Sequence, residues 1–141
     1  MGTPIRPPVD PALRPVTFDA GALIAIERGA SDIRALARTL ALGGTPILIP
    51  APAVAEVWRG GTGRQARLAQ FLITGIESRH VQIVDLDFEV AKEVGALLAR
   101  APMSITDGAV CRCALLARGG VVTSDPTDIG RIIPPDRIKV V

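Results

Sequence analysis

Cysteine is scarce in this chain of 141 residues, which contains only Cys111 and Cys113. Residues two apart on a helix point about 200° away from each other, so these two thiols cannot face one zinc ion. No second cysteine pair and no histidine cluster supports a zinc site either. A GxSxG motif is also missing, so the sequence gives no support for a serine hydrolase. We expect both cysteines to be small, buried, apolar residues.

Long apolar runs are missing as well. No stretch of about 18 apolar residues exists, so no transmembrane helix is predicted. The N-terminus lacks the basic and then apolar pattern of a secretory signal, and we therefore expect a cytoplasmic protein without a membrane partner. Lysine occurs only as Lys92 and Lys139, and the net charge is +2. Charge alone therefore does not indicate a nucleic-acid partner.

The chain does contain enough apolar residues for a core, since 48% of it is hydrophobic, and its length suits one domain. The first residues are rich in proline, which predicts a flexible arm over residues 1–14 and a single domain over residues 15–141. Short apolar runs predict strands at 16–19, 47–49, 81–84, 121–123 and 138–141.

Helical spacing of apolar residues separates these runs, with Ser31, Asp87 and Thr106 as the expected N-caps of three helices. Strands that alternate with helices indicate parallel pairing and right-handed crossovers. Apolar strand runs are typical of a sheet that is covered on both faces. The sequence therefore predicts an α/β fold, a three-layer α/β/α sandwich around a parallel five-stranded sheet.

Four acids lie where predicted strands end or helices begin: Asp19, Glu56, Asp107 and Asp125. In a parallel sheet such positions meet at one edge, where ligands of open α/β sheets bind. Carboxylates gathered there repel each other unless a divalent cation neutralises them, and Mg²⁺ and Mn²⁺ prefer such oxygen ligands. The alternative is that each acid is only an N-cap or a turn residue. That alternative suits Asp107 and Asp125 better than Asp19 and Glu56, so we expect a metal site.

Four short motifs in this order resemble PIN-domain nucleases: Phe18-Asp19-Ala20-Gly21-Ala22-Leu23, Pro52-Ala53-Val54-Ala55-Glu56-Val57, Thr106-Asp107-Gly108-Ala109 and Thr123-Ser124-Asp125-Pro126-Thr127-Asp128. The resemblance runs from about Val16 to Val141 and is greatest to VapC-type toxins of bacterial toxin–antitoxin pairs. It implies a PIN-like (flavodoxin-like) sandwich and an endoribonuclease that depends on Mg²⁺ or Mn²⁺.

Mapped by motif, the resemblance makes Asp19, Glu56, Asp107 and Asp125 the catalytic, metal-binding acids. Asp128 matches a further acid of many members, and is a candidate for a second metal or for holding a ligand in place. Hydrolysis would use metal-activated water, with a 5′-phosphate and a 3′-hydroxyl as the expected ends. Two departures stand out: no hydroxyl residue follows Asp19, and Gly108 stands where alanine is common.

Candidate substrate-binding residues follow the acids along the chain. Thr123 and Ser124 precede Asp125 and are placed to bind a phosphate oxygen or to fix the carboxylate, although a strand-end hydroxyl also commonly satisfies backbone groups. Arg59, Arg64 and Arg67 come after the Glu56 helix and are candidates to follow an RNA backbone; a solvated helix face is the alternative. His80 precedes its strand, which places it at the opposite end of the sheet from the acids.

Two other functions remain open. A phosphoacceptor receiver domain would use Asp85 and Lys139, but it leaves Glu56 and Asp107 unexplained. A non-catalytic PIN-like module that binds RNA or protein is the main alternative, although such modules usually lack one of the acids.

The resemblance also implies partners: an RNA substrate, a small cognate antitoxin, and a homodimer or larger toxin–antitoxin assembly. The helices around residues 23–26, 35–42 and 58–71 carry apolar residues in excess of what one side of a small sheet needs. An apolar groove there is a candidate site for an antitoxin segment.

Overall fold

The computed structural model describes residues 14–141, so the expected arm at 1–14 lies outside the described residues apart from Arg14. The strands of this part are β1 (Val16–Phe18), β2 (Ile47–Pro50), β3 (Val81–Val84), β4 (Val121–Thr123) and β5 (Ile138–Val140). The α-helices are α1 (Ala20–Arg28), α2 (Ser31–Leu42), α3 (Ala51–Val57), α4 (Ala66–Glu77), α5 (Phe88–Arg100) and α6 (Ile105–Ala117). Short 3-10 turns are η1 (Gly63–Gln65), η2 (Ile129–Arg131) and η3 (Pro135–Arg137).

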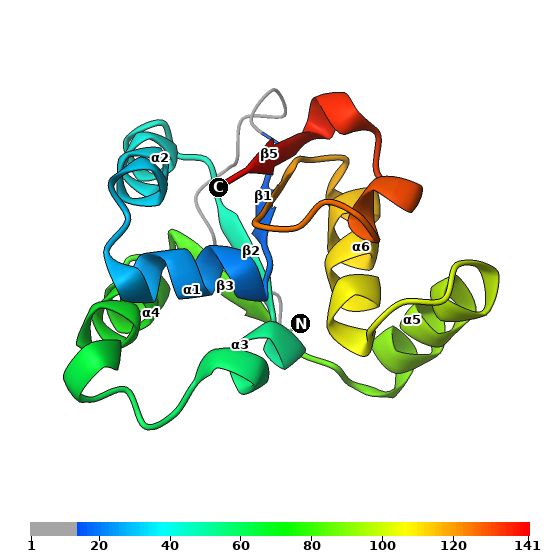
Figure 1. The fold of residues 1–141 in the computed structure, drawn as a ribbon, viewed down its shortest axis with the longest axis horizontal. Helices are drawn as coiled ribbons and strands as arrows, with labels where there is room; N and C mark the ends of the chain where they lie inside the picture. The colour runs from blue at the N-terminus through cyan, green and yellow to red at the C-terminus, as the bar shows by residue number, and fades with distance from the viewer. Residues whose placement is uncertain (1–13) are drawn as a thin grey trace, which may run out of the picture.

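The five strands form one parallel sheet in the order β3-β2-β1-β4-β5. Helices α1, α2 and α4 lie on one side of the sheet and α5 and α6 on the other (Figure 1). This arrangement confirms the predicted α/β sandwich with a parallel five-stranded sheet. Because β3 is an edge strand, Asp85 at its end is separated from Asp19 by β2, which does not suit a receiver domain.

The central strands contribute to a hydrophobic core on each face of the sheet, because successive side chains of a strand point to opposite faces. Phe18 of β1 packs with Leu23 of α1 and with β2, while Val121 of β4 packs with Val110 of α6. All of these side chains are buried. The two central strands therefore hold a helix layer on each side, and their carboxyl ends are fixed from both faces.

Two predicted helix caps are wrong. Ala30 stands at the N-cap of α2 without a side-chain hydrogen bond, and Ser31 is the first residue of the helix. Ser104, and not Thr106, caps α6, where its hydroxyl accepts from the N–H of Asp107 at 3.0 Å. The predicted cap at Asp87 is confirmed by its bond from the N–H of Val90. None of the helices within residues 14–141 has the length and apolar character needed to cross a membrane.

Gly108, which stands where the PIN pattern commonly has alanine, has a role in the packing of α6 against α5. A Cβ at this position would lie 2.9 Å from Leu98 Cδ2 and 3.1 Å from Val94 Cγ1, both on α5. The missing side chain therefore lets α5 and α6 approach closely. A glycine in a helix costs about 1 kcal/mol relative to alanine, and the close approach of α5 gives a packing reason for glycine here.

Candidate active site

The candidate site lies at the carboxyl ends of β1 and β4. These strands are neighbours although they are far apart in the sequence, and the strand order reverses between them. Crevices at such a reversal are where open α/β sheets bind ligands. Asp19 directly follows β1, and its N–H donates to the carbonyl of Val122 at 3.2 Å. Asp125 comes two residues after the end of β4, so both acids lie at this reversal.

Asp19 is at once the N-cap of α1 and a buried acid. Its Oδ1 accepts from the N–H of Ala22 at 2.9 Å, so the simple capping role is real. Only 6% of the residue is exposed, and this burial raises the pKa of its carboxyl group. The Thr123 side chain and the N–H of Ala22 counter that rise by hydrogen bonding, while the charge of Asp107 adds to it. Capping alone needs neither the burial nor the acidic neighbour.

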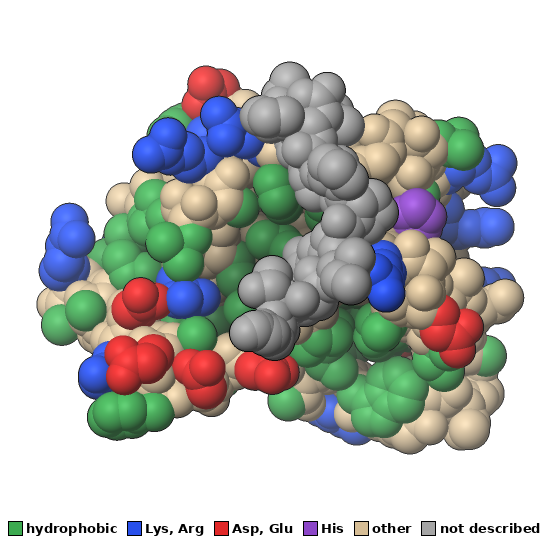
Figure 2. Space-filling model, turned by 180° about the vertical axis from the view of Figure 1, so that it is seen from behind, with side chains coloured by type: hydrophobic (Ala, Val, Ile, Leu, Met, Phe, Trp, Pro, Cys, Tyr) green, Lys and Arg blue, Asp and Glu red, His purple; other side chains and the backbone are tan. Residues whose placement is uncertain are grey.

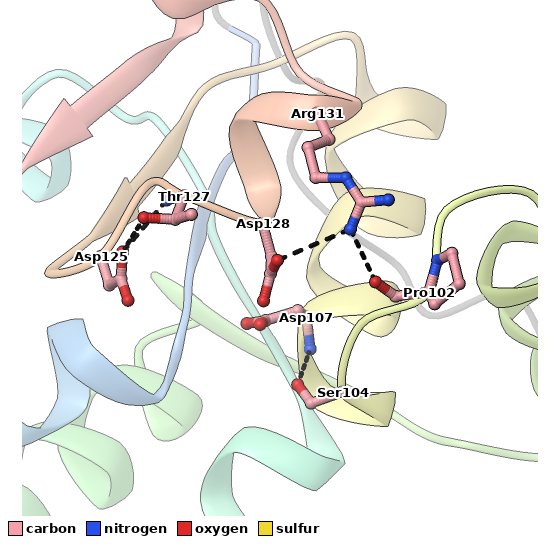
Figure 3. A network of polar contacts seen from close by, with 7 residues as sticks. All are labelled: Pro102, Ser104, Asp107, Asp125, Thr127, Asp128 and Arg131. Carbon is pink, nitrogen blue, oxygen red and sulfur yellow. Dashed lines mark hydrogen bonds and ion pairs between the residues drawn. The ribbon is translucent and has the colours of Figure 1, made fainter.

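Asp107 lies at the centre of the acidic group, in the first turn of α6. Burial raises the pKa of its carboxyl group most, and the charges of Asp128, Glu56 and Asp125 raise it further, against a hydrogen bond with Ser104. In Figure 3 the side chains of Asp107 and Asp128 point toward one another. Together with Asp19, whose pKa Asp107 raises, four acids interact electrostatically with this one residue.

Glu56 reaches the group from the last turn of α3 and is exposed. Its Oε1 accepts a hydrogen bond of 2.5 Å from the hydroxyl of Thr106, which is 5% exposed. This bond joins α3 to the start of α6, one residue before Asp107.

Asp125 and Asp128 come from the loop after β4. The N–H and hydroxyl of Thr127 donate to Asp125 Oδ1 at 3.1 and 2.7 Å, which lowers the pKa of this exposed carboxyl group. Asp128 forms an ion pair of 3.7 Å with Arg131, whose guanidinium also donates to the carbonyl of Pro102 at 2.7 Å (Figure 3). Each acid is therefore held by a residue that follows it in the same segment, Asp125 by Thr127 and Asp128 by Arg131.

These donors suit a hard cation. All five side chains offer carboxylate oxygen, the ligand that Mg²⁺ and Mn²⁺ prefer, and the raised pKa values of Asp19 and Asp107 show unrelieved burial and repulsion. Within residues 14–141, no three His, Cys, Asp or Glu side chains are close enough to hold a metal ion as a finished cage. Mg²⁺ commonly keeps several waters and takes only one or two carboxylates directly, so the donor set fits that ion.

Comparison with known proteins decides the family. The PIN domain matches residues 16–132, which cover the whole acidic group. The chain belongs to the PIN-domain family. No curated protein matches it.

Solved structures share the fold of this PIN domain at low identity. A toxin–antitoxin complex from Klebsiella pneumoniae aligns with a TM-score of 0.62 and 20% identity over 89% of this chain and 96% of that chain. VapBC2 from Rickettsia felis, bound to a DNA fragment from its promoter, aligns with a TM-score of 0.64 and 17% identity over 89% of this chain and 98% of that chain. FitAB bound to the IR36 DNA fragment aligns with a TM-score of 0.57 and 18% identity over 81% of this chain and 87% of that chain.

The two hydroxyl residues before Asp125 differ in this PIN domain. Thr123 is fully buried, and its Oγ1 accepts from the N–H of Asp125 at 3.0 Å, which suits fixing the acid and not binding a phosphate. Ser124 is exposed. A Cβ on Gly21 would lie 2.0 Å from Ser124 Oγ, so the serine hydroxyl occupies the space beside α1 that a side chain at position 21 would fill. A hydroxyl therefore lies beside Gly21, two residues after Asp19, although no hydroxyl residue directly follows Asp19 in the sequence.

The three candidate arginines do not form one cluster. The guanidinium of Arg59 turns back to the carbonyls of Trp58 and Ala55, at 2.7 and 3.4 Å. Arg64 is exposed on η1. Arg67 lies beside Gly29, where its guanidinium carbon would be 3.0 Å from an added Cβ, and it lines a groove on the α1, α2 and α4 side.

Two neighbours of the acids are not among the residues predicted for the site. The sequence predicts Thr106 only as a helix cap, although its place next to Asp107 is a signal that it belongs to the site. Arg131 lies three residues after Asp128, a spacing at which opposite charges on a helical turn meet.

Proposed function

We propose that this PIN domain is an endoribonuclease that uses Mg²⁺ or Mn²⁺ and acts as the toxin of a toxin–antitoxin pair. The observation that carries the proposal is the convergence of Asp19, Glu56, Asp125 and Asp128 on Asp107, from separate segments of the chain. A structural group of caps would not need to bring five negative charges together. The chain belongs to a family whose members are generally nucleases, which supports a nuclease role for these acids.

Asp19, Glu56, Asp107 and Asp125 would surround the ion, with one or two of them binding it directly and the others acting through its bound waters, and with Asp128 beside Asp107. A bound divalent ion supplies neutralisation of phosphate charge and lowers the pKa of water, so that hydroxide forms near neutral pH. The chain itself supplies fixed acids: Asp19 and Asp125 each have one oxygen held by backbone N–H groups.

The two cysteine thiols and the Thr123 hydroxyl are poorly placed to act as nucleophiles. The thiols of Cys111 and Cys113 are buried, and burial raises their pKa values to about 12 and about 11, so they are not ionised at neutral pH. The hydroxyl of Thr123 is enclosed. Attack by metal-activated water, the route that the resemblance implies, uses none of these three groups.

A groove formed by α1, α2 and α4 supports a protein partner. It measures about 530 Å³ and is lined by Ile26, Phe71 and Val81 with Arg34, Arg38 and Arg67 at its polar positions. Figure 2 shows basic side chains gathered around the single histidine, His80, which lines the same groove. A small antitoxin with an apolar segment and acidic side chains suits this surface.

The resemblance also leads us to expect toxin dimers. Light scattering of the purified protein tests that oligomeric state.

Cleavage of labelled RNA and of labelled DNA by the purified protein tests the proposed activity. We expect metal-dependent cutting of RNA, 5′-phosphate ends, and loss of cutting with EDTA. A folded protein that binds RNA but cuts nothing with either ion would contradict the proposal and favour a non-catalytic binding module.

A further inference from the structure

Among the acids of the site, Glu56 has the side chain that is fixed least by its own helix. Helix α3 has seven residues, lacks a side-chain N-cap bond, and ends in an extended residue at Trp58. The side chain of Glu56 is exposed and has three rotatable bonds, whereas Asp19 and Asp125 are tied to neighbouring backbone N–H groups. Electrostatic repulsion between the Glu56 and Asp107 carboxylates favours turning the Glu56 side chain out into water.

Thr106 opposes that movement. Its hydroxyl donates to Glu56 Oε1 at 2.5 Å, a hydrogen bond to a charged acceptor and thus among the stronger kinds. The donor itself is rigid, because Thr106 is 5% exposed, branched at Cβ, and lies in the first turn of a helix that Ser104 caps. The same turn carries Asp107, so one helix start fixes two of the acids relative to each other.

We propose that Thr106 is a positioning residue, which holds the Glu56 carboxylate beside Asp107 and so prepares the acidic group for a divalent cation. This inference rests on the proposed function, because it assigns the hydroxyl a part in the same metal site. Partners that orient a metal ligand typically change metal affinity or activity by about 10- to 100-fold when removed. We expect the loss of this hydroxyl to fall in the lower part of that range, since Glu56 is one of several acids.

The test compares three variants by titrating Mn²⁺ into the purified protein and measuring the free ion by electron paramagnetic resonance. Thr106→Val removes the hydroxyl at constant shape and should weaken Mn²⁺ binding about tenfold, whereas Thr106→Ser keeps the hydroxyl and should restore binding. Thr17→Val is the matched control, because Thr17 is fully buried and its hydroxyl has no hydrogen-bond partner. It should bind Mn²⁺ as the unmodified protein does.

Glu56→Gln separates positioning from general destabilisation. If Thr106 acts through Glu56, the double variant Thr106→Val with Glu56→Gln should bind Mn²⁺ no more weakly than Glu56→Gln alone. Additive losses, or normal Mn²⁺ binding by Thr106→Val, would overturn the positioning role while leaving the nuclease proposal intact. Failure of the unmodified, folded protein to bind Mn²⁺ would overturn both.

Discussion

Replacement of Asp19 by Asn should make the metal-free protein more stable and abolish its response to metal. Asn is as good an N-cap as Asp, so the bond from the Ala22 N–H survives and capping contributes little to the difference. The change removes a negative charge that is 6% exposed and lies beside the charge of Asp107. Asp19→Ala, which also removes the cap, should lose about 1 kcal/mol relative to Asp19→Asn.

The pH dependence of this effect has a definite sign. Burial raises the pKa of Asp19 above the ordinary 3.8, so the folded protein keeps this proton longer than the unfolded chain does. Below the unfolded pKa both states are protonated, and Asp19→Asn should match the unmodified protein. As the pH rises through the pKa of Asp19 in the folded protein, the unmodified protein loses stability relative to the variant. Above that pKa the difference between their free energies of unfolding stays constant.

Metal should reverse the order of the two proteins. At a Mn²⁺ concentration 100 times its dissociation constant, binding to the folded state contributes about 2.7 kcal/mol. At about 3 °C per kcal/mol for a chain of this size, this raises the melting temperature by about 8 °C. Thermal unfolding with Mn²⁺ and with EDTA measures both effects. An Asp19→Asn protein that melts at a lower temperature than the unmodified protein without metal, or that gains as much stability from Mn²⁺, would contradict the role assigned to the Asp19 charge.

Three further substitutions test the surroundings of the site. Gly21→Ala places a Cβ 2.0 Å from Ser124 Oγ and 3.0 Å from its backbone N, and should cost about 1–3 kcal/mol in urea unfolding, partly recovered by adding Ser124→Gly. Arg137→Ala removes bonds from the guanidinium to the carbonyls of Ala114 and Gly119 at the end of α6, and should cost about 2–3 kcal/mol in the same assay, with Arg137→Lys intermediate. Gln65→Ala removes an amide whose oxygen accepts two N–H groups of the loop after α3, and should raise amide exchange there at least tenfold while α6 exchanges unchanged.

The strands could be predicted because each is a short apolar run between glycines, prolines and polar residues. β3 and β4 match residue for residue, since Val81–Val84 and Val121–Thr123 have no competing pattern. Helix starts were less predictable. Ser31 and Thr106 are good capping residue types, but Ser104 satisfies the start of α6, and the Thr106 hydroxyl is used by Glu56. That choice depends on a residue 50 positions away, which local sequence does not encode.

The acids could be located at strand and helix ends from the sequence, but their mutual arrangement could not. Pairing of Thr17 with Val121 and of Phe18 with Val122 sets the register of β1 and β4, and only this register brings Thr123 beside Asp19. Similarly, the arginines after α3 are neighbours in sequence, yet Arg59 turns back on its own helix while Arg67 faces the groove.

Cutting of labelled total RNA by the purified protein tests whether the acids around Asp107 form a metal-dependent nuclease site. We expect cleavage with Mg²⁺ or Mn²⁺ that is lost with EDTA and with Asp107→Asn, while Asp87→Asn, which replaces the acid that caps α5, leaves cutting normal. Cleavage by a folded Asp107→Asn protein at the unmodified rate would contradict the account.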